Sequence, residues 1–192
     1  MDSVAKGEAK DAILEMLKEL TCIPSCTVKV DDVEDKQLKT LLGTVWLWGS
    51  NPKARFQSFT RNGLAQIKIV VSGSVRHILI DYNRLPAQHR RGEKFDEIIS
   101  HIANLPDDVA KTLCDEDIIS EATVGPWQAL YVPSGFLVFE ETAQGSLVFG
   151  LRQSILTKST ASQSRYQAII ELYTATKQSL GKMEEVLELM KP

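Results

Sequence analysis

The middle of this chain is a succession of short apolar segments, each followed by a glycine- or proline-containing turn. The segments are rich in β-branched, aromatic and other apolar residues, which is typical of β-strands. The most distinct of them are 44–48, 64–72, 75–82, 129–132, 136–140 and 146–151. We count about eight strands between residues 44 and 155, so the sequence predicts a β-rich core.

One local feature within this core favours a specific arrangement. The segments 64–72 and 75–82 are alternating strand patterns on either side of the pair Gly73-Ser74. A tight glycine turn between two such segments is the usual signature of a β-hairpin. We therefore expect these two strands to pair with each other.

Helical patterns flank and interrupt the strands. Apolar residues recur at helical spacing over 5–20, over 95–105 and in a stripe of about 25 residues near the C-terminus. That stripe consists of Tyr166, Ile169, Ile170, Tyr173, Leu180, Met183, Leu187 and Met190. It predicts a C-terminal helix that either packs on its own domain or pairs between subunits.

Together these patterns predict an α+β protein that forms a single domain over residues 1–192. Its predicted parts are an N-terminal helical segment (1–43), the β core (44–155) with a helical insertion at about 94–120, and a C-terminal helix (156–192). The N-terminus has no signal-peptide pattern and the apolar runs are too short to cross a bilayer. We therefore expect an intracellular protein, cytoplasmic or nuclear, that does not bind membranes. The three cysteines, Cys22, Cys26 and Cys114, are expected to be free thiols.

Charge is unevenly distributed along the chain. Residues 44–94 carry nine basic and two acidic side chains, a net charge of +7, whereas residues 95–150 carry one basic and ten acidic side chains, a net charge of −9. Two interpretations are open. The two windows neutralise each other or form solvated faces in the folded protein, or the basic window contacts an anionic partner such as nucleic acid.

The strand and turn pattern also resembles a known family, the JmjC-like, cupin-type double-stranded β-helix. Its first half resembles VWLWGSNPKARFQSFTRNGLAQIKIVVSGSVRHILI at 45–80. Its second half, with a Pro-x-Gly-aromatic turn, resembles GPWQALYVPSGFLVFEE at 125–141, and its closing strand resembles GSLVFGLRQSI at 145–155. The resemblance covers residues 44–155 and implies a cupin-like β-barrel, or jelly-roll, core.

The residues that would bind a metal in this family are missing. Its oxygenases hold Fe(II) through a His-x-Asp/Glu pair and a distant histidine. The resemblance places the pair within Arg-Phe-Gln-Ser at 55–58 and the distant histidine near Val138, and none of these residues is a plausible iron ligand. It therefore implies a barrel that has lost its metal site, and we predict no cofactor and no catalytic residue.

Two other groups of residues are candidate sites. His77 and Asp81 lie four apart on the same side of a predicted strand, about 13 Å from each other, too far to form a dyad. The tryptophans Trp46, Trp48 and Trp127 fit either the core or a ligand pocket at the barrel mouth.

The sequence thus predicts a non-catalytic binding or scaffold protein that acts through protein–protein contacts or self-association. One alternative is a divergent metal-dependent oxygenase or other cupin enzyme, in which at least two of His77, His89 and His101 converge. The other is a nucleic-acid-binding protein. Its phosphate contacts would be the basic residues Lys53, Arg55, Arg61, Arg84, Arg90, Arg91 and Lys94.

Overall fold

The computed structural model describes residues 3–4, 27–50, 56–59, 63–142 and 147–192. The helix expected at 5–20 and the thiols of Cys22 and Cys26 lie outside the described residues. Cys114, which lies within them, is a free and exposed thiol.

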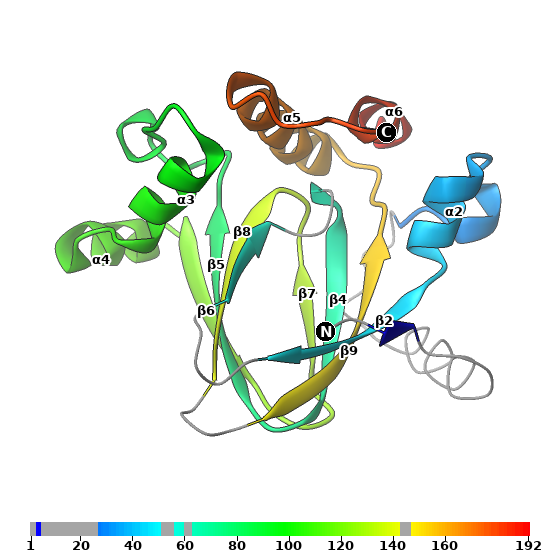
Figure 1. The fold of residues 1–192 in the computed structure, drawn as a ribbon, viewed down its shortest axis with the longest axis horizontal. Coiled ribbons are helices and arrows are strands. Elements are labelled where there is room, and N and C mark those ends of the chain that lie inside the picture. Colours follow the sequence, from blue (N-terminus) through cyan, green and yellow to red (C-terminus); the bar gives the residue numbers. More distant parts are fainter. Residues whose placement is uncertain (1–2, 5–26, 51–55, 60–62, 143–146) are drawn as a thin grey trace.

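Two antiparallel sheets face each other to form the core of the protein (Figure 1). The first sheet has the strand order β1-β2-β9-β4-β7, and the second has the order β3-β8-β5-β6. The first sheet contains β1 (Ser3–Val4), β2 (Val45–Ser50), β4 (Ala65–Ser72), β7 (Ala129–Val132) and β9 (Val148–Ile155). The second contains β3 (Phe56–Phe59), β5 (Val75–Asp81), β6 (Ile119–Val124) and β8 (Phe136–Thr142).

This strand order defines the fold. Apart from the two-residue edge strand β1, each sheet has four strands, and the orders β2-β9-β4-β7 and β3-β8-β5-β6 are those of a jelly roll. The jelly roll, built from two Greek keys, is the architecture of cupins. The predicted α+β class with a cupin-like jelly-roll core is therefore confirmed by the topology itself.

The hairpin predicted for 64–82 is wrong. Strand β4 pairs with β7 and β9, while β5 pairs with β6 and β8 in the opposite sheet. The chain crosses between the sheets at Gly73, whose φ of +85° places it in the left-handed region that favours glycine. A crossing of this kind needs the same glycine turn and the same alternation as a hairpin, so the local sequence does not distinguish the two.

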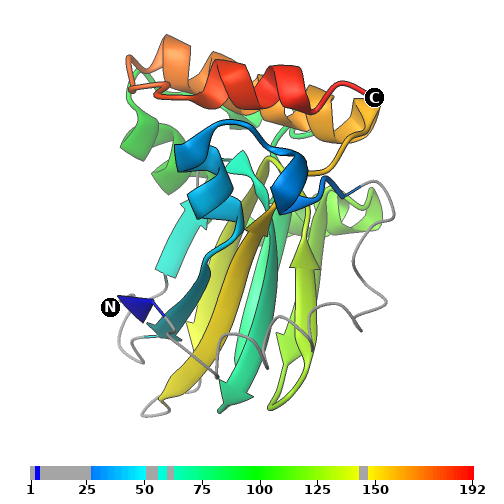
Figure 2. The ribbon, with the colours of Figure 1, turned by 90° about the vertical axis from the view of Figure 1, so that its right-hand side faces the viewer.

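The helices of the described ranges gather at one end of the barrel, with the β4–β5 turn at the other end (Figures 1 and 2). They are α2 (Lys36–Leu42), α3 (Phe95–Ala103), α4 (Asp107–Asp115), α5 (Thr160–Ala175) and α6 (Met183–Leu189), with 3-10 turns η1 (Val30–Asp32) and η3 (Ala87–His89). The insertion predicted at about 94–120 is confirmed, because α3 and α4 lie between β5 and β6 in the chain. No helix within the described ranges is long and apolar enough to cross a membrane.

The single C-terminal helix predicted for 156–192 is instead two helices. Helix α5 ends near Thr176, where Lys177 adopts a φ of +56° and the N–H of Gln178 donates to the carbonyl of Tyr173. A left-handed residue followed by such a backward bond is a Schellman-type helix end. The apolar stripe still packs on its own chain, since Tyr166, Ile169 and Met183 belong to the largest hydrophobic cluster.

That cluster lies between the outer face of the second sheet and the helices. It joins Ile80 of β5 and Phe139 of β8 to Ile98 of α3 and Ile169 of α5, all of them buried. Because strand side chains alternate between faces, the neighbouring residues of β5 and β8 point into the barrel. The outward residues therefore anchor the helices, and the inward residues form the site described next.

Candidate functional site

Three ionisable side chains meet inside the barrel. Lys68 of β4 reaches across from the first sheet, and its Nζ donates to Oε1 of Glu140 on β8 in the second sheet. His77 of β5 is the cross-strand neighbour of Glu140, and its Nε2 lies 3.3 Å from the same oxygen. The side chains of Lys68, Glu140 and His77 are only 5%, 6% and 0% exposed.

Apolar layers enclose this charged layer along the barrel. On one side lies a cluster of Trp48, Val70, Val75, Val124 and Val148. On the other side lies a cluster that includes Leu79, Val132 and Val138. Lys68, His77 and Glu140 each lie two positions from one of these apolar residues on the same strand. Because every second side chain of a strand points to the same face, the three charged residues lie in the core as well.

The electrostatics of this layer are dominated by the pair of Lys68 and Glu140. Burial by itself raises the pKa of Glu140, but the Lys68 ammonium and the neighbouring His77 outweigh it and lower that pKa to about 2. Glu140 is therefore an ionised carboxylate, held by a cation that arrives from the opposite sheet. The pair links the two sheets through the centre of the barrel.

Trp48 closes one side of the layer. Its ring lies edge-on to His77, with centroids 6.4 Å apart at 73°, and 5.7 Å from the Lys68 ammonium, within range of a cation–π contact. Its Nε1 donates to the carbonyl of Leu151 at 3.3 Å. A Cβ on Gly150 would lie 2.5 Å from Nε1 of Trp48, so only glycine allows this approach. Trp48 is thus a core residue that fixes the position of the charged layer.

These residues do not fit the iron site of the resembled family. His77 and Glu140 supply two possible metal ligands. The third side chain in contact with them is Lys68, whose ammonium repels a metal cation. Among the described residues, no group of three His, Cys, Asp or Glu side chains could hold a metal ion. Strand β3 pairs with β8 at Val138 and Phe139. Val138, near which the resemblance places the distant histidine, is part of an apolar cluster.

The remaining histidines lie between β5 and β6 in the chain. His89 of η3 and His101 of α3 stack with ring centroids 6.4 Å apart. These two histidines thus lie together, as the oxygenase alternative requires, but among the described residues no third His, Cys, Asp or Glu joins them to form a metal site. The oxygenase alternative stays a prediction.

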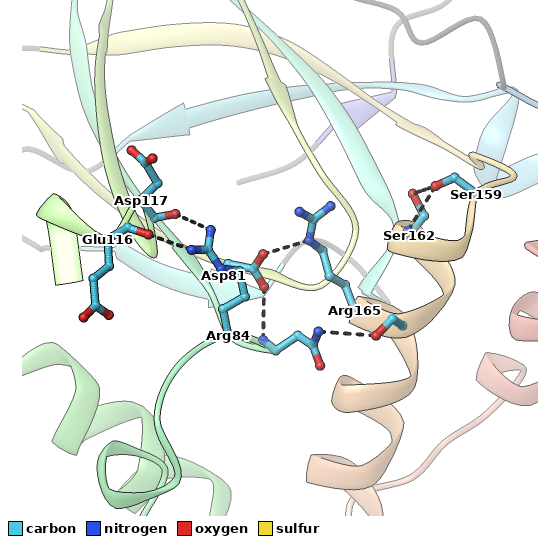
Figure 3. A network of polar contacts seen from close by, with 9 residues as sticks. Asp81, Arg84, Glu116, Asp117, Ser159, Ser162 and Arg165 are labelled. Atoms are coloured by element: carbon cyan, nitrogen blue, oxygen red, sulfur yellow. Dashed lines mark hydrogen bonds and ion pairs between the residues drawn. The ribbon is translucent and has the colours of Figure 1, made fainter.

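A second buried carboxylate links the barrel to α5 (Figure 3). Asp81 lies on the same face of β5 as His77, as predicted. The two side chains contact different residues. Its Oδ2 accepts a hydrogen bond of 2.8 Å from Nε of Arg165, and its Oδ1 accepts one of 3.2 Å from the N–H of Asn83. The guanidinium of Arg165 also lies 5.2 Å from the ring of Phe136. Asp81 therefore fixes α5 over the barrel mouth.

Several of the predicted phosphate contacts are engaged within the chain. The Arg84 guanidinium donates to the carbonyls of Glu116 and Asp117 at 2.6 and 2.9 Å (Figure 3). Arg90 lies 5.5 Å over the ring of Tyr82, and Lys94 lies 3.7 Å from Glu97. Arg91 is exposed, and Lys53, Arg55 and Arg61 lie outside the described residues. The nucleic-acid interface stays a prediction.

The basic and acidic windows contact each other in the fold. Lys68 binds Glu140 inside the barrel, and outside it Arg76 binds Glu121 at 2.6 Å and Glu141 at 2.8 Å. Each of these pairs joins one residue of the basic window to one of the acidic window. The contacts favour mutual neutralisation as the explanation of the charge pattern.

An apolar patch is exposed where strands of the first sheet end. We call Trp127, Leu147 and Phe149 the apolar tip; they are 68%, 63% and 55% exposed. Phe149 pairs with Ser72 on one side of β4, and the N–H of Trp127 donates to Val70 on its other side. Trp127 has a φ of +62°, which is costly for a bulky residue. The core interpretation of this tryptophan is therefore wrong.

Comparisons with known proteins give only a distant likeness. No protein-family model matches the chain, and a sequence search finds no curated relative. The S. wedmorenis hydroxypropylphosphonic acid epoxidase in complex with fosfomycin is similar with a TM-score of 0.36 at 10% identity, over 64% of this chain and 47% of that one. The Fe(II) form of HppE is similar with a TM-score of 0.31 at 11% identity, over 58% and 40%. The chain thus spans less than half the length of these structures, and its classification as a cupin-like jelly roll rests on its own strand order.

Proposed function

We propose that this chain is a non-catalytic jelly-roll protein that binds a protein partner through its apolar tip. The observation that carries the proposal is Trp127, a large aromatic side chain held in solvent by a strained backbone. Strain of this kind concentrates at functional sites. Tryptophan is also among the residues most enriched at the energetic centres of protein interfaces.

The geometry of the tip supports a protein interface. Trp127 and Phe149 lie on either side of the end of β4. The backbone of each is paired or hydrogen-bonded to that strand, so the sheet fixes where each residue lies. The backbone of Leu147 lies close to Gly73, the residue after β4, since its carbonyl would be 2.7 Å from a Cβ at that position. Large exposed apolar side chains on neighbouring segments are typical of interaction sites.

The barrel interior supports the non-catalytic part of the proposal. The Lys68 ammonium donates to Oε1 of Glu140, and the ring of Trp48 lies against both Lys68 and His77. Because these buried side chains contact one another, we infer that the protein acts through its surface. The chain is accordingly interpreted as a cupin-type barrel that has lost its metal site.

The test compares two variants in affinity capture from extracts of the source cells, followed by quantitative mass spectrometry. Trp127→Asn with Phe149→Thr removes the tip while keeping a residue that tolerates positive φ at 127. Leu189→Ser is the matched control, because Leu189 is an exposed apolar residue on α6. We expect the tip variant to reduce capture of a specific partner about 30-fold or more, as for loss of a tryptophan hot spot, and the control to retain it.

Two results would reject the proposal. One is that no captured protein depends on the tip while both variants remain folded. The other is that the purified protein holds iron, manganese or zinc tightly in a one-to-one ratio, which would place metal chemistry back in the barrel.

A further inference from the structure

A pocket lies at the opposite end of the molecule from the apolar tip. Helix α2 stands beside the α5–α6 pair (Figure 2), and a cavity of about 470 Å³ opens between them and β2. That size falls within the range of small-molecule pockets. We call it the helical pocket.

The walls of the helical pocket are mostly apolar and aromatic. They include Leu38 of α2, Trp46 of β2, Tyr166 and Tyr173 of α5, and Met183 and Val186 of α6. Leu38, Met183 and Val186 are also part of the main hydrophobic cluster, so these walls are held by the core and not by loops. A pocket with such walls binds apolar and aromatic groups.

One polar group in this lining has no protein partner. Tyr166 is fully buried, yet its hydroxyl makes no hydrogen bond within the described part of the chain. A buried hydroxyl without a partner costs free energy, which a ligand atom at hydrogen-bond distance would recover. Burial also raises the pKa of Tyr166, so the phenol stays neutral and can both donate and accept.

The charges at the pocket already neutralise each other. Lys182, the N-cap residue of α6, donates to Asp35 at the N-cap of α2 and lies 3.3 Å from Glu185. An anionic ligand would have to displace a carboxylate from this lysine, and a cationic ligand would meet the lysine itself. The pocket therefore favours a neutral ligand.

We propose that the helical pocket binds a small, neutral, largely aromatic molecule that has one hydroxyl or carbonyl oxygen directed at the hydroxyl of Tyr166. The site is independent of the apolar tip and of the charged layer. It gives the protein a ligand-binding function in addition to partner binding.

A matched pair of probes tests the proposal. 2-Naphthol and naphthalene have the same aromatic body, and only the first carries a hydroxyl. Titration of each into the ¹⁵N-labelled full chain, followed by NMR, gives both affinity and location. We expect saturable shifts in α2 and α6, with 2-naphthol binding about threefold to tenfold more tightly, the gain typical of one hydrogen bond.

Three variants assign the binding. Tyr166→Phe keeps the ring and should abolish the advantage of 2-naphthol while naphthalene binds as before. Thr40→Trp places a bulky side chain at the exposed rim of the pocket and should prevent binding of both probes. Tyr131→Phe is the control, because Tyr131 lies on β7 and does not line the pocket, and it should change neither affinity.

Any of three results would overturn the proposal. The first is that neither probe binds saturably at millimolar concentration. The second is that the two probes bind the wild type equally. The third is that folded Thr40→Trp, checked by circular dichroism, binds both probes as well as the wild type.

Discussion

Two ion-pair clusters occupy opposite faces of the same two strands. On β5, His77 points into the barrel and its neighbour Arg76 points out; on β8, Glu140 points in and Glu141 points out. The inner cluster is completed by Lys68 from the other sheet. The outer cluster is completed by Glu121 of β6 in the same sheet.

The two clusters differ in how far water reaches them. The side chains of Lys68 and Glu140 are 5% and 6% exposed, whereas those of Arg76 and Glu121 are 47% and 46% exposed. Water and salt screen the outer pairs, which limits their contribution to about 0–1 kcal/mol. A buried pair is costly to form but still costlier to break, because either partner alone would be an unpaired charge in the core.

The comparison also assigns the clusters different structural roles. The outer pairs join neighbouring strands that backbone hydrogen bonds already hold together. The inner pair joins two sheets that share no backbone ladder at that point. We infer that the inner pair determines how the two sheets pack against each other. The outer cluster lies on a surface that the backbone pairing of the strands already forms.

The largest expected effect comes from breaking the inner pair. Lys68→Met keeps the apolar stem and removes the ammonium, which leaves the Glu140 carboxylate buried without a counter-charge. We expect the free energy of unfolding to fall by about 3–5 kcal/mol, measured by urea denaturation followed by circular dichroism.

The double variant Lys68→Met with Glu140→Leu is the control for this prediction. It replaces both charges with apolar groups, so most of the lost stability should return. A single variant as stable as the wild type would show that the carboxylate has no need of Lys68.

The next effect is the acid sensitivity that Glu140 contributes. Its pKa is about 2 in the folded protein, against 4.5 for an unperturbed glutamate. The unfolded chain therefore takes up this proton first, so the stabilisation is complete above about pH 4.5 and is lost as the pH falls towards 2. Because one pKa unit is worth about 1.4 kcal/mol, the loss is on the order of 3 kcal/mol.

Comparison of the wild type with Glu140→Gln isolates this contribution. Unfolding free energies measured between pH 6 and pH 2.5 should fall more steeply for the wild type than for the variant. Parallel curves for the two proteins would contradict the assignment.

The sequence predicts the outer cluster better than the inner one. Alternation on the strands, the insertion between β5 and β6 and the jelly-roll class all follow from local patterns and from the family resemblance. The mutual neutralisation of the two charge windows was one of two interpretations, and Arg76 with Glu121 and Glu141 is its clearest example. Such contacts need only that basic and acidic strands lie side by side.

The inner cluster needs information that local patterns do not contain. The hairpin prediction placed β4 beside β5, which would have kept Lys68 and His77 in one sheet. The actual crossing at Gly73 puts them in facing sheets, where Lys68 meets Glu140, 72 positions away in the chain. One signal was present: Lys68 and Glu140 are charged residues inside apolar strand patterns. The alternation does not say that Lys68 points to the core, because it shares its face with Gln66, opposite Ile67 and Ile69.

The smallest expected effect comes from the outer cluster, and it decides whether the contrast between the two faces is real. Arg76→Gln removes the guanidinium that contacts Glu121 and Glu141 but keeps a polar side chain on the exposed face of β5. We expect a loss of no more than about 1 kcal/mol in the free energy of unfolding at low salt. In 1 M NaCl, where screening acts over about 3 Å, even that difference between wild type and variant should shrink. The destabilisation by Lys68→Met should persist in the same salt, because water and ions do not reach the inner pair. If salt reduced both losses equally, or if Arg76→Gln cost as much as Lys68→Met, burial would not be what separates the two clusters.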